Sequence, residues 1–170
     1  MTFRLTHTQK GFTLVELLIV IGIMGLLAAV IFVAVGRARA SARIAKAQAD
    51  LAQFRTGIEL MASDTGKWPN GCPIESSANP EVELNQPAAG LASAPPVGVV
   101  ELPCEWTATE VTYWNGPYAG TASTLDPWGT SYWFDADYVP LGSEVVVLLS
   151  YGPDKTNYTP DDIILVMRQE

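Results

Sequence analysis

Hydrophobic residues follow three different patterns along this chain of 170 residues, and each pattern predicts a different element. The first pattern is a run of 24 residues, 12–35, that is apolar throughout except for Glu16. As a helix this run would be roughly 36 Å long, which is sufficient to span a bilayer with some tilt. Because core helices of water-soluble domains rarely stay apolar on every face, the run predicts a membrane-spanning helix.

The second pattern is an apolar seam that recurs every three or four residues, so the helix is expected to continue as an amphipathic segment over residues 36–66. Gly66 favours the C′ position of a helix and Pro69 cannot continue one, so together they predict its end. We expect the seam to pack on a sheet of the same chain rather than to form an independent coiled coil. Its members are Ala40, Ile44, Ala47, Leu51, Phe54, Ile58 and Met61.

The third pattern is a series of short β-type runs near the C-terminus. Residues 131–139 are rich in aromatic side chains, residues 144–150 are apolar and β-branched, and residues 162–168 resemble a final strand. Turns are predicted between them, at 140–143 and 152–162. The segment 124–170 is therefore expected to form a small antiparallel sheet that carries an acidic turn.

Residues 67–123 join the helix to this sheet and are dense in proline, glycine, asparagine and serine. They predict a long irregular loop, with a short helix near Pro87–Ala92. The predicted fold class is therefore α+β: a long N-terminal α-helix, half membrane-spanning and half amphipathic, packed on a small antiparallel head.

Charge is divided unevenly along the chain. From residue 67 to the C-terminus there are fourteen acidic and three basic residues, so we expect no nucleic-acid partner. The lone histidine, His7, precedes the apolar run and leaves the rest of the chain without an imidazole for base catalysis or zinc binding. Two carboxylate pairs could act as acid and base, but such pairs are common on solvated strand edges, so no enzymatic activity is expected. They are Asp135 with Asp137, and Asp126 with Glu144.

Residues 1–11 precede the apolar run and carry basic side chains, which favours an N-terminus left in the cytoplasm. No small-residue cleavage site follows the run, so we expect the helix to be retained. A second basic group lies beyond the run and competes with this orientation. It consists of Arg37, Arg39, Arg43 and Lys46.

Cys72 and Cys104 both fall in the loop-rich segment. If this part of the chain lies outside the cytoplasm, a disulfide between them is expected. The alternative is a pair of buried free thiols. A metal site is less favoured, because no third or fourth soft ligand is available.

The stretch "KGFTLVELLIVIGIMGLLAAV" resembles the leader junction of type IV pilins and pseudopilins. The resemblance implies that a prepilin peptidase cleaves after Gly11 and methylates the new amino group of Phe12. It also implies that Glu16 pairs with the N-terminal amine of a neighbouring subunit, which would compensate a carboxylate that is costly inside a membrane. The alternative is a Glu16 that reaches the headgroups. Val33 stands where many members of the family have a proline, so no weakening of the helix is expected there.

The stretches "TGKWP", "LDPWGTSYWF" and "SYGPDKTNYTPDDIILV" resemble the major pseudopilin of type II secretion systems. In that group the turn before the last strand binds calcium. The resemblance implies carboxylate ligands from Asp154, Asp161 and Asp162, completed by backbone oxygens of Tyr151 and Thr159. Three carboxylates in one short turn would repel one another when no cation is bound, and hard cations prefer such oxygen clusters. The alternative is a solvated acidic turn.

These features predict a structural subunit anchored in the cytoplasmic membrane, with its head outside the cytoplasm. It would polymerise with copies of itself on an inner-membrane assembly platform into a periplasmic pseudopilus. The main alternative is the major pilin of an extracellular type IV pilus, for which the long middle region offers additional surface. A less favoured alternative is a membrane-anchored binding module whose tryptophans stack on sugars.

Overall fold

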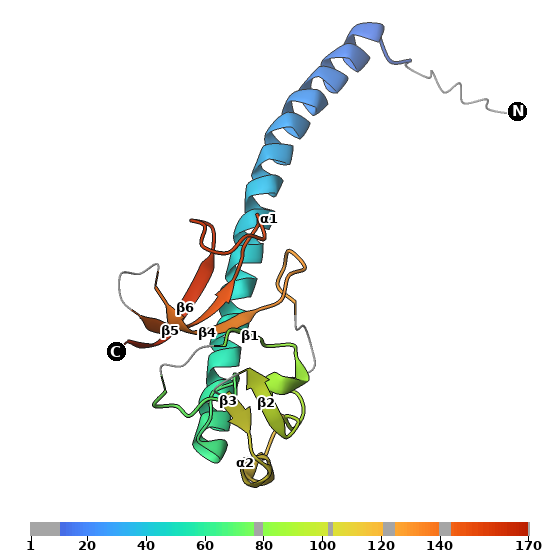
Figure 1. Ribbon diagram of the computed structural model, residues 1–170. Coiled ribbons are helices and arrows are strands. Elements are labelled where there is room, and N and C mark those ends of the chain that lie inside the picture. The colour runs from blue at the N-terminus through green and yellow to red at the C-terminus, as the bar shows by residue number, and fades with distance from the viewer. Residues whose placement is uncertain (1–10, 77–79, 102–103, 121–124, 140–143, 170) are drawn as a thin grey trace, which may run out of the picture. The chain divides into compact units, whose positions relative to one another are not determined.

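The computed structural model describes residues 11–76, 80–101, 104–120, 125–139 and 144–169. The chain forms two compact units, Met1–Ser41 and Ala42–Glu170, and helix α1 (Leu14–Thr65) contributes to both (Figure 1). The predicted leader, apart from Gly11, and the turn predicted at 140–143 lie outside the described residues.

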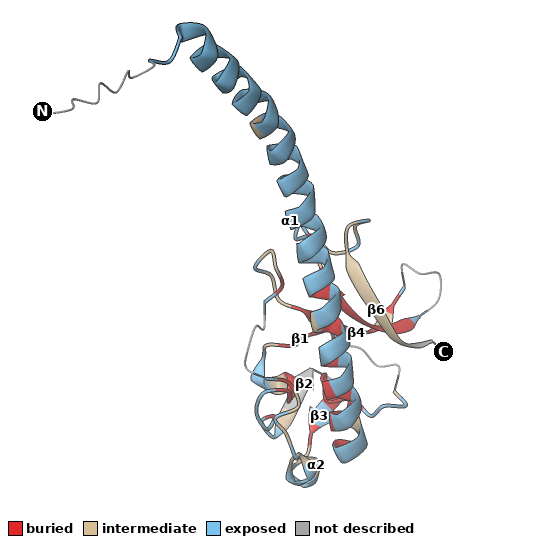
Figure 2. Ribbon diagram, turned by 180° about the vertical axis from the view of Figure 1, so that it is seen from behind, coloured by how far each residue is buried: buried red, intermediate tan, exposed pale blue. Residues whose placement is uncertain are grey.

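In its described part, residues 11–41, the first unit consists mainly of the apolar half of α1, whose side chains have almost no packing partner there. Figure 2 shows this half of the helix exposed along nearly its whole length. By length and composition this helix can cross a membrane, since its most apolar window has a mean hydropathy of 3.1. The predicted long apolar helix is therefore confirmed.

The end of α1 agrees with the predicted stop signal. The helix ends at Thr65, and Gly66 follows with a φ of 72°, the left-handed conformation that a C′ glycine adopts. The Gly66 amide donates a 2.8 Å hydrogen bond to the Ala62 carbonyl, which satisfies one of the carbonyls left free by the end of the helix.

The second unit packs the amphipathic half of α1 on a four-stranded antiparallel sheet. Its strands are β1 (Val82–Glu83), β4 (Trp133–Tyr138), β5 (Val145–Ser150) and β6 (Ile163–Gln169), in the order β1-β4-β5-β6 (Figure 1). The three strands expected from the sequence are confirmed as β4, β5 and β6. The additional strand β1 has two residues and pairs with Trp133 and Phe134 of β4.

One face of the sheet forms the main core together with α1. Five seam residues are buried in it: Ala47, Leu51, Phe54, Ile58 and Met61. From the sheet, Phe134, Ala136, Val146 and Leu148 meet them. Ile44 remains 41% exposed and Ala40 is exposed, so the buried part of the seam begins at Ala47. The opposite face of the sheet holds a smaller cluster around Tyr138, Val147 and Leu149.

The segment between α1 and β4 contains more regular structure than the sequence indicated. Strands β2 (Gly98–Glu101) and β3 (Cys104–Trp106) form a separate antiparallel ribbon, and helix α2 (Ala108–Tyr113) follows directly. The short helix expected near Pro87–Ala92 is a single 3₁₀ turn, η1 (Pro87–Ala89). A ribbon and a capped helix turn thus stand where an irregular loop was expected.

Candidate functional site

The predicted processing site lies immediately before α1. Gly11 and Phe12 are both exposed, with Phe12 86% accessible, and neither belongs to the helix. An extended, accessible peptide bond is what a protease needs, because a helical bond must first unwind. The local structure at Gly11–Phe12 is therefore compatible with cleavage there.

Glu16 closes the first turn of α1 through a reciprocal pair of hydrogen bonds with Thr13. Its carboxylate accepts from the Thr13 backbone amide at 2.9 Å and from the Thr13 hydroxyl at 2.7 Å. In return, the Glu16 amide donates to the Thr13 hydroxyl oxygen at 3.2 Å. This is a capping box, in which two otherwise unpaired helix amides are satisfied. All of these bonds to the carboxylate use Oε2.

The same motif occurs a second time, at α2, where Thr107 and Glu110 make the equivalent pair of bonds. The spacing T-x-x-E at 13–16 and at 107–110 is the signal in the sequence that predicts both helix starts. Helix α2, which the expected irregular loop did not include, begins at this spacing.

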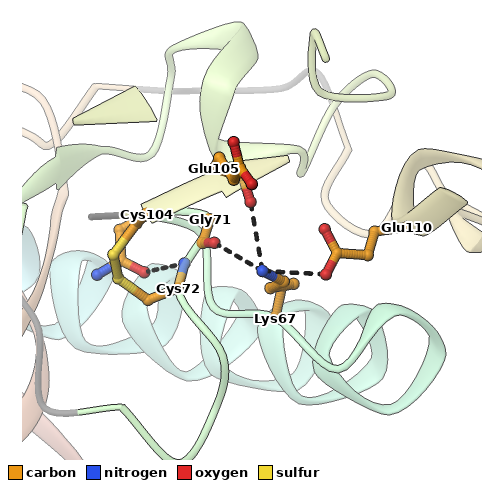
Figure 3. The surroundings of a disulfide bond; sticks show 7 residues. Lys67, Gly71, Cys72, Cys104, Glu105 and Glu110 are labelled. Atoms are coloured by element: carbon orange, nitrogen blue, oxygen red, sulfur yellow. Dashed lines mark hydrogen bonds and ion pairs between the residues drawn. A yellow bond between two sulfur atoms is a disulfide. The ribbon is translucent and has the colours of Figure 1, made fainter. Parts of the chain in front are cut away.

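Cys72 and Cys104 form the expected disulfide, which joins the turn after α1 to strand β3 (Figure 3). The neighbouring Lys67 is buried, and its ammonium reaches the carbonyl oxygens of Gly71 at 3.2 Å and Glu105 at 3.3 Å. It also forms a 3.0 Å ion pair with Glu110. The disulfide and this lysine therefore tie the ribbon and α2 to the end of α1.

The electrostatics around Lys67 favour the charged form of Glu110. Burial alone would raise the pKa of this carboxyl, but hydrogen bonds from Thr107 and Lys67 hold it below its usual value. Glu110 therefore serves both as the cap of α2 and as the counter-ion of a buried lysine.

The three predicted calcium ligands lie together in the turn between β5 and β6. Asp154, Asp161 and Asp162 all have a carboxylate oxygen near the Thr159 hydroxyl, at 3.4, 2.9 and 3.3 Å. The Thr156 carbonyl oxygen is a fourth acceptor at 3.0 Å. One hydroxyl carries one proton, so it cannot satisfy all four acceptors at once. The turn therefore gathers more hard oxygen acceptors around Thr159 than its single hydroxyl can serve.

Backbone amides also donate hydrogen bonds to these carboxylates. The Asp154 amide donates to Asp161 at 3.1 Å, and the Thr159 amide donates to Asp162 at 3.1 Å. Hydrogen bonds from Asp154 and Thr159 lower the pKa of Asp161. The pKa of Asp162 is raised, chiefly by burial. Tyr151, the fifth predicted ligand, follows β5 at the start of the turn, and its ring stacks on Trp133.

The donor chemistry of this turn suits calcium, which takes carboxylate and carbonyl oxygens. The arrangement, however, is held together by the hydrogen bonds around Thr159. In the described part of the chain, no three His, Cys, Asp or Glu side chains are placed so as to hold a metal ion. The residues therefore fit the ion in kind, while their geometry is that of a hydrogen-bonded turn.

The tryptophans do not form an exposed aromatic surface. Trp68 and Trp106 are buried in the head core, and the other three are partly buried: Trp114, Trp128 and Trp133. The indole nitrogens of Trp106 and Trp114 donate to the carbonyl oxygens of Ala88 and Gly90. These side chains mainly pack the loop region onto the head, which argues against a dedicated sugar-binding face.

Two of the carboxylates considered for catalysis, Asp126 and Asp135, are buried in the head. Asp126 accepts hydrogen bonds from Ser150 and from both the amide and hydroxyl of Thr130, and these bonds hold the turn before β4 in place. Asp135 is 1% exposed, and its Oδ2 finds no hydrogen-bond partner among the described residues. Burial, together with the charges of Glu81 and Asp137, raises the pKa of Asp135 to about 7.

Comparison with known proteins identifies relatives of this chain. Residues 6–32 match the family model described as the prokaryotic N-terminal methylation motif. The chain is 25% identical to the type II secretion system core protein G of Dickeya chrysanthemi over 160 residues, 91% of this chain and 84% of that protein. It is 39% identical to a type IV major fimbrial protein FimA of Dichelobacter nodosus over 64 residues, 38% of this chain and 40% of that protein. No solved structure matches it significantly.

Proposed function

From its membership of the type IV pilin and pseudopilin family, whose proteins are structural rather than enzymatic, we propose that this chain is a subunit of a helical filament, the pseudopilus of type II secretion. The observation that carries the proposal is the fully exposed apolar half of α1, which begins directly after the accessible Gly11–Phe12 bond. Such a surface must be covered either by lipid or by other copies of the same helix.

Before assembly, the apolar segment anchors the subunit in the cytoplasmic membrane, with the disulfide-bearing head on the oxidising side. A prepilin peptidase removes residues 1–11 and methylates Phe12. An inner-membrane platform then adds the subunit to the filament, where lipid contacts are exchanged for contacts between helices.

Glu16 has a second role in this scheme, beyond the capping of its own helix. Its Oε2 is used by Thr13, and Oε1 receives no hydrogen bond among the described residues. In the filament this oxygen pairs with the Phe12 amine of a neighbouring subunit. The pairing compensates two charges that are costly in an apolar environment and sets the axial position of one subunit against the next.

A secretion pseudopilus is favoured over a surface pilus because the similarity to core protein G extends over 91% of this chain, whereas the similarity to the fimbrial protein covers 38%. The alternative is a type IV pilus used at the cell surface. Fractionation separates the two: subunits sheared from the cell surface indicate a pilus, and processed subunits confined to the envelope indicate a pseudopilus.

The proposal is tested by two substitutions at Glu16 with different chemistry. Glutamine can replace glutamate in a capping box, so Glu16→Gln keeps the start of α1 but removes the charge. Glu16→Val removes both. The pairing of Glu16 with the Phe12 amine is supported if both variants fail to form filaments while mass spectrometry of the whole protein shows normal cleavage after Gly11. Normal assembly of Glu16→Gln shows that the cap is the role of Glu16, and absence of processing in the unmodified chain overturns the filament proposal itself.

Calcium binding by the acidic turn is a separate proposal. The support for it is the excess of acceptors around Thr159, which a divalent cation would relieve. Binding should raise the melting temperature of the full chain in detergent, measured with calcium against a chelator. The effect should be lost in Asp161→Asn and kept in Glu75→Gln, an exposed carboxylate elsewhere on the head. An unchanged melting temperature in the unmodified chain would rule calcium out and leave the filament proposal standing.

A further inference from the structure

Arg39 and Arg43 form a like-charged pair one helical turn apart on the exposed surface of α1. Residues four apart lie on the same face of a helix, so the two guanidinium groups repel each other. Further along, α1 pairs its basic side chains with acids at the same spacing: Lys46 with Asp50 at 2.6 Å and Arg55 with Glu59 at 2.7 Å. Among the described residues, no ion pair involves Arg39 or Arg43.

The position of this pair in the chain is also unfavourable for membrane insertion. The two arginines follow the apolar run closely, and arginines on the translocated side of a span oppose an N-terminus left in the cytoplasm. An anionic partner that is met after insertion would explain why the chain carries positive charge at this place.

A groove on the head has the chemistry that such a partner needs. It has a volume of about 310 Å³. One wall is the stacked pair of Trp133 and Tyr151, whose ring centroids are 5.6 Å apart with an angle of 19° between the rings. Glu83 of β1 lines the groove beside them, and its carboxylate accepts a 3.0 Å hydrogen bond from Ser131. The remaining lining residues are Leu125, Gly129, Thr130 and Lys155.

The surroundings of the groove are negatively charged. The carboxylate of Glu83 lines the groove itself. Asp126 lies behind Thr130 of the lining and accepts a hydrogen bond from its hydroxyl. Burial alone would raise the pKa of Asp126, but hydrogen bonds from Ser150 and Thr130 hold it below its usual value, so it adds a negative charge.

An aromatic wall beside a carboxylate is suited to a guanidinium group. The planar cation stacks on aromatic faces and at the same time donates to a carboxylate. We propose that the Arg39–Arg43 pair of one subunit docks on the Trp133–Tyr151 groove of a second copy, with one guanidinium against the aromatic pair and bonded to Glu83. This inference rests on the proposed filament. Lys155 at the groove opposes docking and limits its strength.

The contact between the Arg39–Arg43 pair and the groove is tested by substitutions that reverse the charge on each surface. The variant Arg39→Glu with Arg43→Glu, and the variant Glu83→Arg, should each lower the yield of filaments in cells at least tenfold. The chain that carries all three changes should regain a substantial part of the yield, because the opposite charges again face each other. In every variant, processing at Gly11 and the Cys72–Cys104 disulfide report that the subunit is inserted and folded.

Variants that remove charge without reversing it provide a second test. Arg39→Gln with Arg43→Gln should reduce filament assembly. The matched control is Arg55→Gln, which breaks an ion pair within one subunit and should leave assembly unchanged. Lys155→Gln should increase assembly or leave it at least equal. Dependence on the arginines without dependence on Glu83 would overturn the groove and point to lipid phosphates as their partner.

The remaining outcomes are also decisive. If the triple variant shows no recovery although both parents are impaired, the two surfaces do not meet and the inference fails. If all charge variants assemble as well as the unmodified chain, the inference fails while the filament proposal stands. If the unmodified chain forms no filaments, the proposed function itself fails.

Discussion

The phenol of Tyr132 donates a 2.7 Å hydrogen bond to the Asp50 carboxylate and so joins the β4 end of the sheet to α1 across 82 residues of sequence. The tyrosine is completely buried, and its ring also packs on Phe54 of the helix, with ring centroids 5.3 Å apart. Burial and the Asp50 charge both raise the pKa of Tyr132, so the phenol keeps its proton and remains a donor. This bond sets the position of the helix on the sheet.

Replacing Tyr132 by phenylalanine should therefore destabilise the head by about 1–3 kcal/mol, because a charged acceptor loses its buried donor. Urea unfolding of the full chain in detergent, followed by tryptophan fluorescence, measures the change. Tyr113→Phe, at a tyrosine that is 59% exposed, is the matched control and should have little effect. Equal stability of the two variants would show that Asp50 is satisfied by Lys46 and solvent.

Gly57 allows α1 to approach the loop that carries Tyr118. A Cβ atom at this position would lie 2.6 Å from the Tyr118 carbonyl oxygen, a backbone atom that cannot turn away. Gly57→Ala should therefore cost about 1–3 kcal/mol, even though alanine is the better helix former. Gly36→Ala is the control, since nothing lies within 4 Å there and the helix should gain stability. A stabilised Gly57→Ala variant would mean that the loop yields without cost.

The Cys72–Cys104 disulfide closes a loop with a sequence separation of 32 residues. In the chain-entropy description a loop of this length contributes about 3–4 kcal/mol by restricting the unfolded chain. The double variant Cys72→Ser, Cys104→Ser should lose about this much stability, and added reductant should lower the melting temperature of the unmodified chain but not of the variant. A loss below about 1 kcal/mol would show that the Lys67 contacts alone hold this region.

Asp135 should make the head less stable as the pH rises from about 4 to about 7. Its pKa is about 7 in the folded chain and about 4 in an unfolded one, so the folded state binds the proton more tightly. The resulting stabilisation is fully present below about pH 4 and is lost as the pH rises to about 7. In calcium-free buffer, Asp135→Asn should flatten this slope and stabilise the head at pH 8, by up to about 4 kcal/mol.

Urea unfolding of both chains between pH 4 and pH 8 provides the measurement for Asp135. Glu75→Gln, at an exposed position, controls for the change of a carboxyl to an amide. If Asp135→Asn follows the same pH dependence as the unmodified chain, the carboxyl is ionised in the folded head and its burial is compensated by a neighbour.

Local patterns predicted those parts of the fold whose residues carry their own periodicity. The spacing from Ala47 to Met61 identified the buried side of α1, and the runs around Phe134, Val147 and Leu165 identified β4, β5 and β6. Strand β1 could not be predicted in this way, because Val82 and Glu83 form a strand through pairing with β4, fifty residues away in the sequence. The acidic turn was located correctly, but the role of the Thr159 hydroxyl depends on side-chain geometry that spacing does not contain.

The exposed apolar half of α1 restricts how the subunit can be supplied and recovered. Phe32 is 78% and Leu26 is 70% accessible in the isolated chain, so a subunit released into water would aggregate. Because of this aggregation, free subunits cannot accumulate in solution, and the subunits awaiting assembly must be held in the bilayer. A filament built from this chain is therefore expected to grow from the membrane and shrink back into it. The same subunits can then be used again.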